Sequence, residues 1–195
     1  MTDQSAAISP GFPASPIRRS YVIAAAVALI GMTAAIRWGS DFQLDFVHVI
    51  AGCLWTGIDL FMGFVVGPIL RRLPLEARRP VISALVPRTL FLMPTLSIVT
   101  STSGWFLADR MGFLAIGYPQ FNWVIASLAI VTLLTIQGLG YLLPTNLRIY
   151  FEMQKPAPDH EKIRRWMHGY VRVVASQGIL QVAINVMMAR FATGL

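Results

Sequence analysis

The sequence has few of the charged residues that a water-soluble protein carries on its surface. Only 13% of its 195 residues are charged and 55% are hydrophobic, whereas a typical soluble domain has about 25% charged residues. A soluble domain of this length could not bury so many apolar side chains. The composition therefore predicts that a lipid bilayer, rather than water, surrounds most of the chain.

Other features are absent as well. A single cysteine, Cys53, excludes an intrachain disulfide and any metal site built from several thiolates. There is no Gly-rich phosphate loop and no Ser/His/Asp pattern of a hydrolase. The net charge of +7 does not indicate nucleic-acid binding, because the basic residues lie in short clusters between apolar runs. The lipid bilayer is the expected partner.

Five apolar segments are long enough to cross a membrane, which takes about 20 residues each. We expect an all-α, five-helix transmembrane bundle, with Pro144 ending the fourth span. Residues 1–19 are polar and contain three prolines, so they predict a flexible cytoplasmic tail before a single transmembrane domain, residues 20–195. The approximate spans are 20–38, 46–70, 89–108, 122–143 and 169–191.

The basic residues predict the orientation of these spans. The tail, the loop RRLPLEARRPVISALVPR between the second and third spans, and the loop between the fourth and fifth spans carry most of them. Because cytoplasmic loops are enriched in Lys and Arg, we expect a cytoplasmic N-terminus and a periplasmic C-terminus. The predicted location is the inner membrane of a bacterium.

The second span carries two ionisable residues in an apolar run, HVIAGCLWTGIDLFMGFVVG. At about 100° per residue, one helix face holds His48, Gly52, Trp55 and Asp59. His48 is predicted near the outer surface and Asp59 near the middle of the membrane, about 16 Å further along the axis.

A carboxyl group at that depth is costly, so Asp59 should face the bundle and find polar partners. In the fifth span Gln177, Gln181 and Asn185 recur at every fourth residue and form one polar stripe. Gln137 of the fourth span is predicted at a comparable depth. We expect these residues to form a polar relay with Asp59.

Three interpretations of His48 remain open. It can be a structural residue that bonds a serine or a water molecule. It can ligate a haem b, since a neutral imidazole binds iron and Gly52 would let a porphyrin approach the helix. It can bind copper together with methionine, whose soft thioether suits Cu(I). His160 and His168 are predicted at the opposite side of the membrane, so they cannot join it.

Several segments resemble a known superfamily. HVIAGCLWTG followed by LFMGFVVGPILRRL resembles the first conserved helix of the CopD-like copper-resistance membrane proteins and of the HemJ-type protoporphyrinogen oxidases. PRTLFLMPTLSIVTSTSGWFL is similar to their next helix, and EKIRRWMHGYVRVVASQGIL is similar to the final helix of the HemJ group. The resemblance implies that His48 occupies the haem-ligating position. The lysine that the HemJ group carries in the helix corresponding to the fourth span is absent here, so the resemblance does not extend to protoporphyrinogen oxidation.

These observations leave three functional hypotheses. The first is a redox or electron-transfer protein that holds haem b through His48, with Trp55, Thr100 and Ser101 lining the pocket. The second is a non-catalytic accessory subunit of a larger membrane complex, or a homo-oligomer, in which the polar stripe joins helices. The third is a copper transport or copper-resistance protein.

Overall fold

The computed structural model describes residues 18–155 and 157–194. Most of the predicted tail, residues 1–17, lies outside the described residues, and Arg19 already begins the first helix. Within the described residues the chain is all-helical, without strands. Five helical segments are long and apolar enough to cross a membrane, which confirms the predicted number of spans: Arg19–Trp38, Asp41–Arg72, Pro80–Arg110, Phe121–Met153 and His160–Ala192.

The second span is the longest of the predicted apolar runs, and three helical pieces make it up. After α1 (Arg19–Trp38), Ser40 begins α2 (Asp41–Phe61) with a reciprocal capping box. The side chain of Gln43 accepts a hydrogen bond of 2.8 Å from the Ser40 backbone N–H, and the Ser40 hydroxyl accepts one of 3.3 Å from the Gln43 backbone. The helix then continues without a break through a π-helical segment, η1 (Met62–Val66), into α3 (Gly67–Arg72).

The remaining elements form the other three spans. α4 (Leu75–Arg110) is followed by a short 3₁₀ turn, η2 (Phe113–Ala115). The fourth span consists of α5 (Phe121–Thr135), the π-helical η3 (Ile136–Leu142) and α6 (Leu143–Met153). The fifth is α7 (His160–Ala192), which begins where the Asp159 carboxylate accepts a 3.0 Å hydrogen bond from the Lys162 backbone N–H.

Two helices extend much further than hydropathy predicts. Most of the segment 71–88, expected to be a loop, is helical, because α4 begins at Leu75. In the same way α7 begins at His160 and not near residue 169. Both extensions are rich in Arg, Leu, Ala, Glu or Lys, which favour helix whether or not lipid surrounds them. Hydropathy detects only the apolar part of such a helix.

The prediction that Pro144 ends the fourth span is also wrong. The helix passes through Pro144, which lies in the first turn of α6 directly after η3. Pro68 has the same position after η1. A proline inside a regular α-helix loses a hydrogen bond and clashes with the preceding turn. The wider π-turn re-routes the backbone hydrogen bonds just before each proline, so the helix continues.

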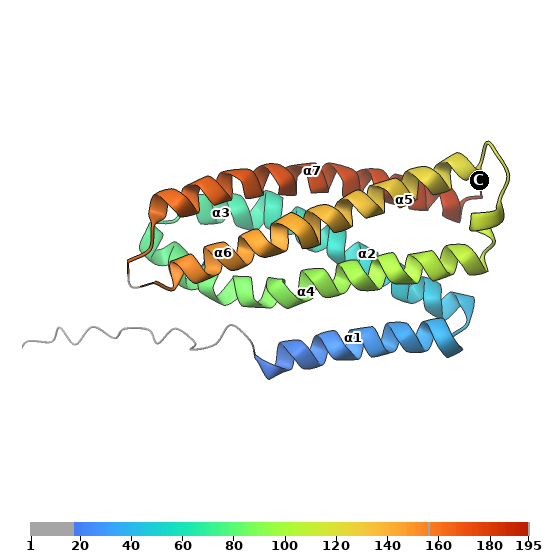
Figure 1. The fold of residues 1–195 in the computed structure, drawn as a ribbon, viewed down its shortest axis with the longest axis horizontal. Helices are drawn as coiled ribbons and strands as arrows, with labels where there is room; N and C mark the ends of the chain where they lie inside the picture. Colours follow the sequence, from blue (N-terminus) through green and yellow to red (C-terminus); the bar gives the residue numbers. More distant parts are fainter. Residues whose placement is uncertain (1–17, 156, 195) are drawn as a thin grey trace, which may run out of the picture.

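The helices form a bundle in which α2 and α4 make the most extensive contact. Figure 1 shows α1 along one side of the bundle and α7 along the other, with the C-terminus at the end opposite the start of α1. The buried apolar side chains lie mainly where α1, α2 and α4 meet, with Met32, Ala51, Trp55, Leu96, Val99 and Leu134 in one cluster.

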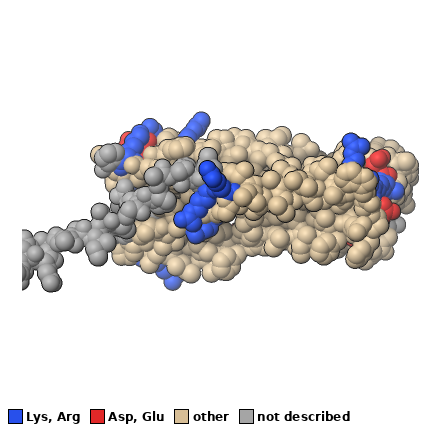
Figure 2. Space-filling view, turned by 90° about the horizontal axis from the view of Figure 1, so that it is seen from below, with Lys and Arg blue, Asp and Glu red and all other residues tan. Residues whose placement is uncertain are grey.

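On the face that Figure 2 shows, charged side chains gather toward the two ends of the bundle and the middle shows none. At one end Arg110 donates hydrogen bonds to the carbonyl oxygens of Gly39 and Ile36 and pairs with Asp41 at 3.4 Å. At the other end Glu152 pairs with Lys155 at 2.8 Å and with Lys162 at 3.5 Å. These contacts join neighbouring helices outside the apolar zone.

Candidate functional site

His48 lies between α2 and α4 in close contact with the backbone of α4. Its Nδ1 is 3.0 Å from the carbonyl oxygen of Thr100 and 3.4 Å from the hydroxyl of Ser103. The ring covers Gly104, where an added Cβ would stand 2.6 Å from the His48 Cε1. Only glycine at position 104 lets the imidazole approach this closely.

The hydrogen bond to Thr100 fixes the tautomer of His48. A carbonyl oxygen can only accept, so Nδ1 must carry the proton when the ring is neutral. The lone pair is then on Nε2, for which no hydrogen-bond partner is found within the described part of the chain. Histidines that ligate metals are held in the same way, with one ring nitrogen donating to a carbonyl and the other free for the metal.

Gly52 does not have the role that the sequence suggested. A Cβ at this position would stand 3.4 Å from the side-chain methyl of Thr100. The small residue therefore allows α4 to pack against α2, so a porphyrin held by His48 would not approach the helix over Gly52. Trp55 does not lie beside His48 either, because it is about two turns further along α2, where it lines the cavity that contains Asp59. The Thr100 and Ser101 hydroxyl oxygens are buried without a hydrogen-bond partner.

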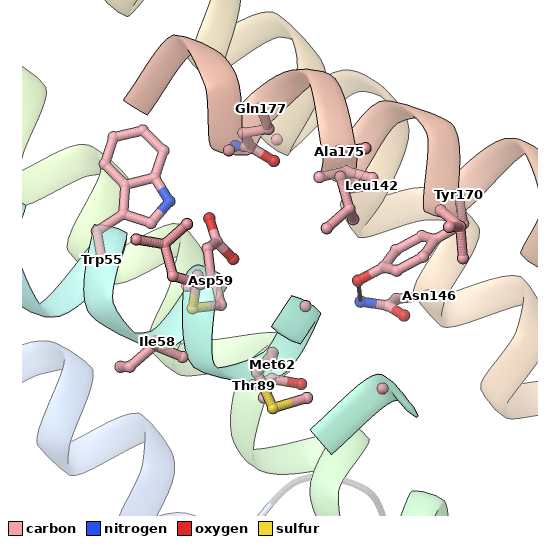
Figure 3. Close-up of a pocket in the computed structure, with 18 of the residues that line it drawn as sticks. Trp55, Ile58, Asp59, Met62, Thr89, Leu142, Asn146, Tyr170, Ala175 and Gln177 are labelled. Carbon is pink, nitrogen blue, oxygen red and sulfur yellow. Dashed lines mark hydrogen bonds between the residues drawn. The ribbon is translucent and has the colours of Figure 1, made fainter. Parts of the chain in front are cut away.

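Asp59 contacts the fifth span directly. Its Oδ2 accepts a 2.7 Å hydrogen bond from the Nε2 of Gln181, a side chain that is only 1% exposed. The indole of Trp55 interacts with the same carboxylate, and Figure 3 shows its N–H on the side facing Asp59. The structure thus places Asp59 toward the bundle, with partners from α2 and α7.

The other members of the predicted relay lie apart from this pair. Gln137 donates a 3.3 Å hydrogen bond to the hydroxyl of Ser176. Gln177 is buried and lines the cavity, with its amide facing the same space as Asp59 (Figure 3). Asn185 is exposed on the outer surface of α7. The expectation that Asn185 joins the relay is wrong, because the helix turns this side chain away from the bundle.

A cavity of about 790 Å³ extends from Asp59 toward the Glu152 end of the bundle. Ligand-binding pockets commonly have volumes of about 300–1,000 Å³. Most of its walls are apolar, and both π-helical segments contribute to them. Its polar lining residues come from four of the five spans: Asp59, Arg71, Arg78, Thr89, Ser97, Asn146, Tyr170 and Gln177.

Sequence reasoning missed part of this polar lining. Asn146 donates a 3.2 Å hydrogen bond to the hydroxyl of Tyr170 across the cavity wall (Figure 3). Ser97, 3% exposed, has no partner for its hydroxyl. A signal was present, since Pro68 and Pro144 interrupt apolar runs, and helix irregularities often accompany functional sites.

The described residues contain no group of three or more His, Cys, Asp or Glu side chains that could hold a metal ion. A copper site at His48 would therefore depend on methionine or other ligands. Comparisons with protein-family models, with curated proteins and with solved structures found no match to this chain.

Proposed function

We propose that this chain is a bacterial inner-membrane redox protein that holds a haem b through His48, with its N-terminus in the cytoplasm. The observation that carries the proposal is the hydrogen bond from His48 Nδ1 to the Thr100 carbonyl, which leaves Nε2 as the only free ligating atom of the ring. Gly104 supports the same orientation, because it lets the ring lie against α4.

His48 would be the single histidine ligand of the haem, because the other two histidines lie at the opposite end of the bundle. His160 begins α7 and His168 lies two turns further on, both at the Glu152 end. His48 lies near the opposite end, one to two turns into α2. A bound haem would supply one-electron chemistry, and the protein would supply the imidazole and its orientation. Thr100 and Ser103 would hold the ring in one tautomer during that chemistry.

An absorbance spectrum tests the proposal. The purified protein should show a Soret band when it is expressed with sufficient haem supply, and the His48→Ala variant should lose it. The His160→Ala variant is the matched control and should keep the full band. No Soret band in the unaltered protein, or an equal band in His48→Ala, would reject the role of His48.

A second candidate is an accessory subunit of a larger membrane complex. Asn185 favours it, because this polar side chain is exposed on the surface of a membrane-spanning helix. Polar side chains in lipid commonly hydrogen-bond to a neighbouring helix. This candidate predicts that the protein co-purifies with a partner under mild detergent. Asn185→Leu should weaken the association, whereas Val186→Leu, at the exposed neighbouring position, should not.

A further inference from the structure

The two ends of the cavity differ in chemistry. We call the end nearest Glu152 the arginine end and the end that contains Asp59 the deep end. Arg71 and Arg78 lie at the arginine end, and they are the only basic residues among the lining residues that the structure describes. The deep end holds Asp59, Ser97 and Gln177. About 18 Å of helix separates Arg71 from Asp59, at 1.5 Å per residue.

The deep end contains hydrogen-bonding groups that the protein does not use. Ser97 and Gln177 are each 3% exposed. The Ser97 hydroxyl has no partner, and no hydrogen bond of the Gln177 amide is found among the described residues. Asp59 accepts from Gln181 through Oδ2 and also interacts with the Trp55 indole, but a carboxylate has room for more than two donors. Buried polar groups without partners are costly, so a guest with its own polar atoms would stabilise this end.

The cavity also reaches the lipid-facing surface. Phe64 of η1 is 78% exposed, Ile179 of α7 is 73% exposed and Val182 is 52% exposed, and all three line the cavity. These residues lie on two helices that face each other across the cavity. A guest can therefore enter sideways from the bilayer and leave an apolar tail in it.

The charges decide against a phospholipid. Its anionic head would take the arginine end, and its acyl chain would then cover Ser97 and Gln177 without satisfying either. An acidic head at the deep end would meet the carboxylate of Asp59. The deep end suits an uncharged head with oxygen atoms that both accept and donate hydrogen bonds.

We propose that this cavity binds a lipid-soluble quinone, with the ring at the deep end and the apolar tail toward the lipid. The Gln177 amide and the Ser97 hydroxyl donate to the carbonyl oxygens of the ring, and Asp59 accepts from the hydroxyl group of the reduced form. The choice of a quinone over another uncharged lipid rests on the proposed redox function; the cavity itself does not involve His48.

The fluorescence of Trp55 reports on this binding directly, because Trp55 lines the deep end. The experiment uses full-length protein in nanodiscs with Trp38, Trp105, Trp123 and Trp166 replaced by phenylalanine. A decyl-substituted benzoquinone is the probe, since quinones quench indole on contact. Bound probe should give saturable quenching, whereas probe that only partitions into lipid gives quenching that rises linearly.

Two glycines of the second span provide a matched pair of variants. Gly63 lines the cavity, and nothing lies within 4 Å of a Cβ added there. Gly63→Leu should fill the space and weaken binding at least tenfold. A Cβ added at Gly57 also meets nothing within 4 Å, but Gly57 does not line the cavity. Gly57→Leu should therefore bind the quinone as tightly as the unaltered protein does. Ser97→Ala should weaken binding about threefold to tenfold, the loss of one hydrogen bond.

The outcomes separate the two proposals. Both glycine variants keep His48, so a haem held there would affect their fluorescence equally. Linear quenching, or equal affinity in Gly63→Leu and Gly57→Leu, would overturn quinone binding while leaving the Soret test untouched. Displacement of the quinone by diacylglycerol at equal concentration would overturn the choice of head group. Saturable quenching by dibromostearate but not by the quinone would favour an acidic lipid and overturn the proposal.

Discussion

Gln181 donates a 2.7 Å hydrogen bond to the carboxylate of Asp59, although 122 positions separate the two residues in the sequence. The bond joins the second and fifth spans near the middle of the apolar zone. It gives the one carboxylate buried at this depth a fixed partner and fixes how the two helices are rotated against each other.

We expect this pair to contribute measurably to stability. Interhelical hydrogen bonds in membranes contribute about 0.6–1.7 kcal/mol, so a double-mutant cycle of Asp59→Leu and Gln181→Leu should give a coupling free energy in that range. Unfolding in mixed detergent micelles with increasing SDS provides the measurement. Asn185→Leu, one turn further along α7 and exposed, should change stability by less than about 0.5 kcal/mol. A coupling free energy of zero would show that the two residues do not interact in the membrane.

Gly104 should tolerate no larger residue. Gly104→Ala places a methyl group against the His48 ring and should lower the free energy of unfolding by about 1–3 kcal/mol, as overpacking does. The control is Gly57→Ala, where the added methyl group meets open space and helix propensity favours alanine by up to about 1 kcal/mol. Adding His48→Ala to Gly104→Ala should restore part of the loss. No restoration would mean that the ring is not what the methyl group displaces.

The start of α7 should depend on pH. The hydrogen bond from the Lys162 backbone lowers the pKa of Asp159 below its ordinary value of 3.8. The carboxylate therefore stabilises the fold fully above pH 3.8, and this contribution is lost as the pH falls through the lower, folded-state pKa. The difference in melting temperature between the unaltered protein and Asp159→Ala should shrink on acidification. Asparagine at position 159 can cap the helix but cannot titrate. The difference in melting temperature between Asp159→Asn and Asp159→Ala should therefore stay constant across the same pH range.

The predicted orientation can be tested with reporter fusions. Alkaline phosphatase is active only outside the cytoplasm, so a fusion after the last residue should be active. A fusion after residue 157, between α6 and α7, should be inactive, because the positive-inside rule places that loop in the cytoplasm. The reverse pattern of activity would show that the bundle has the opposite orientation in the membrane, with the same fold.

The spans were predictable because each is a long apolar run, and the inward face of the second span was predictable because its polar residues follow the helical period. The ends of α4 and α7 were not, since basic helical extensions give no hydropathy signal. Pro144 was misleading because a proline does not necessarily end a membrane helix: η3 precedes Pro144, and α4 continues through Pro80, Pro87 and Pro94.

The site was partly predictable for similar reasons. The contact of Asp59 with the fifth span follows from burial and from the glutamines available there. The roles of Gly52 and Gly104 depend on how closely α2 and α4 approach, which no single helix determines. The cavity depends on the separation of four spans, so Ser97, Asn146 and Tyr170 gave no sequence signal of their own.

The two π-helical segments have a mechanical consequence. Each widens one turn immediately before a proline, so the ladder of backbone bonds is weakest at these two levels, and both levels border the cavity. We therefore expect α3 and α6, which follow these two levels, to bend more readily relative to α2 and α5 than an uninterrupted α-helix would. At the other end of the second span the His48 ring lies directly on Gly104 and holds α2 at a short distance from α4.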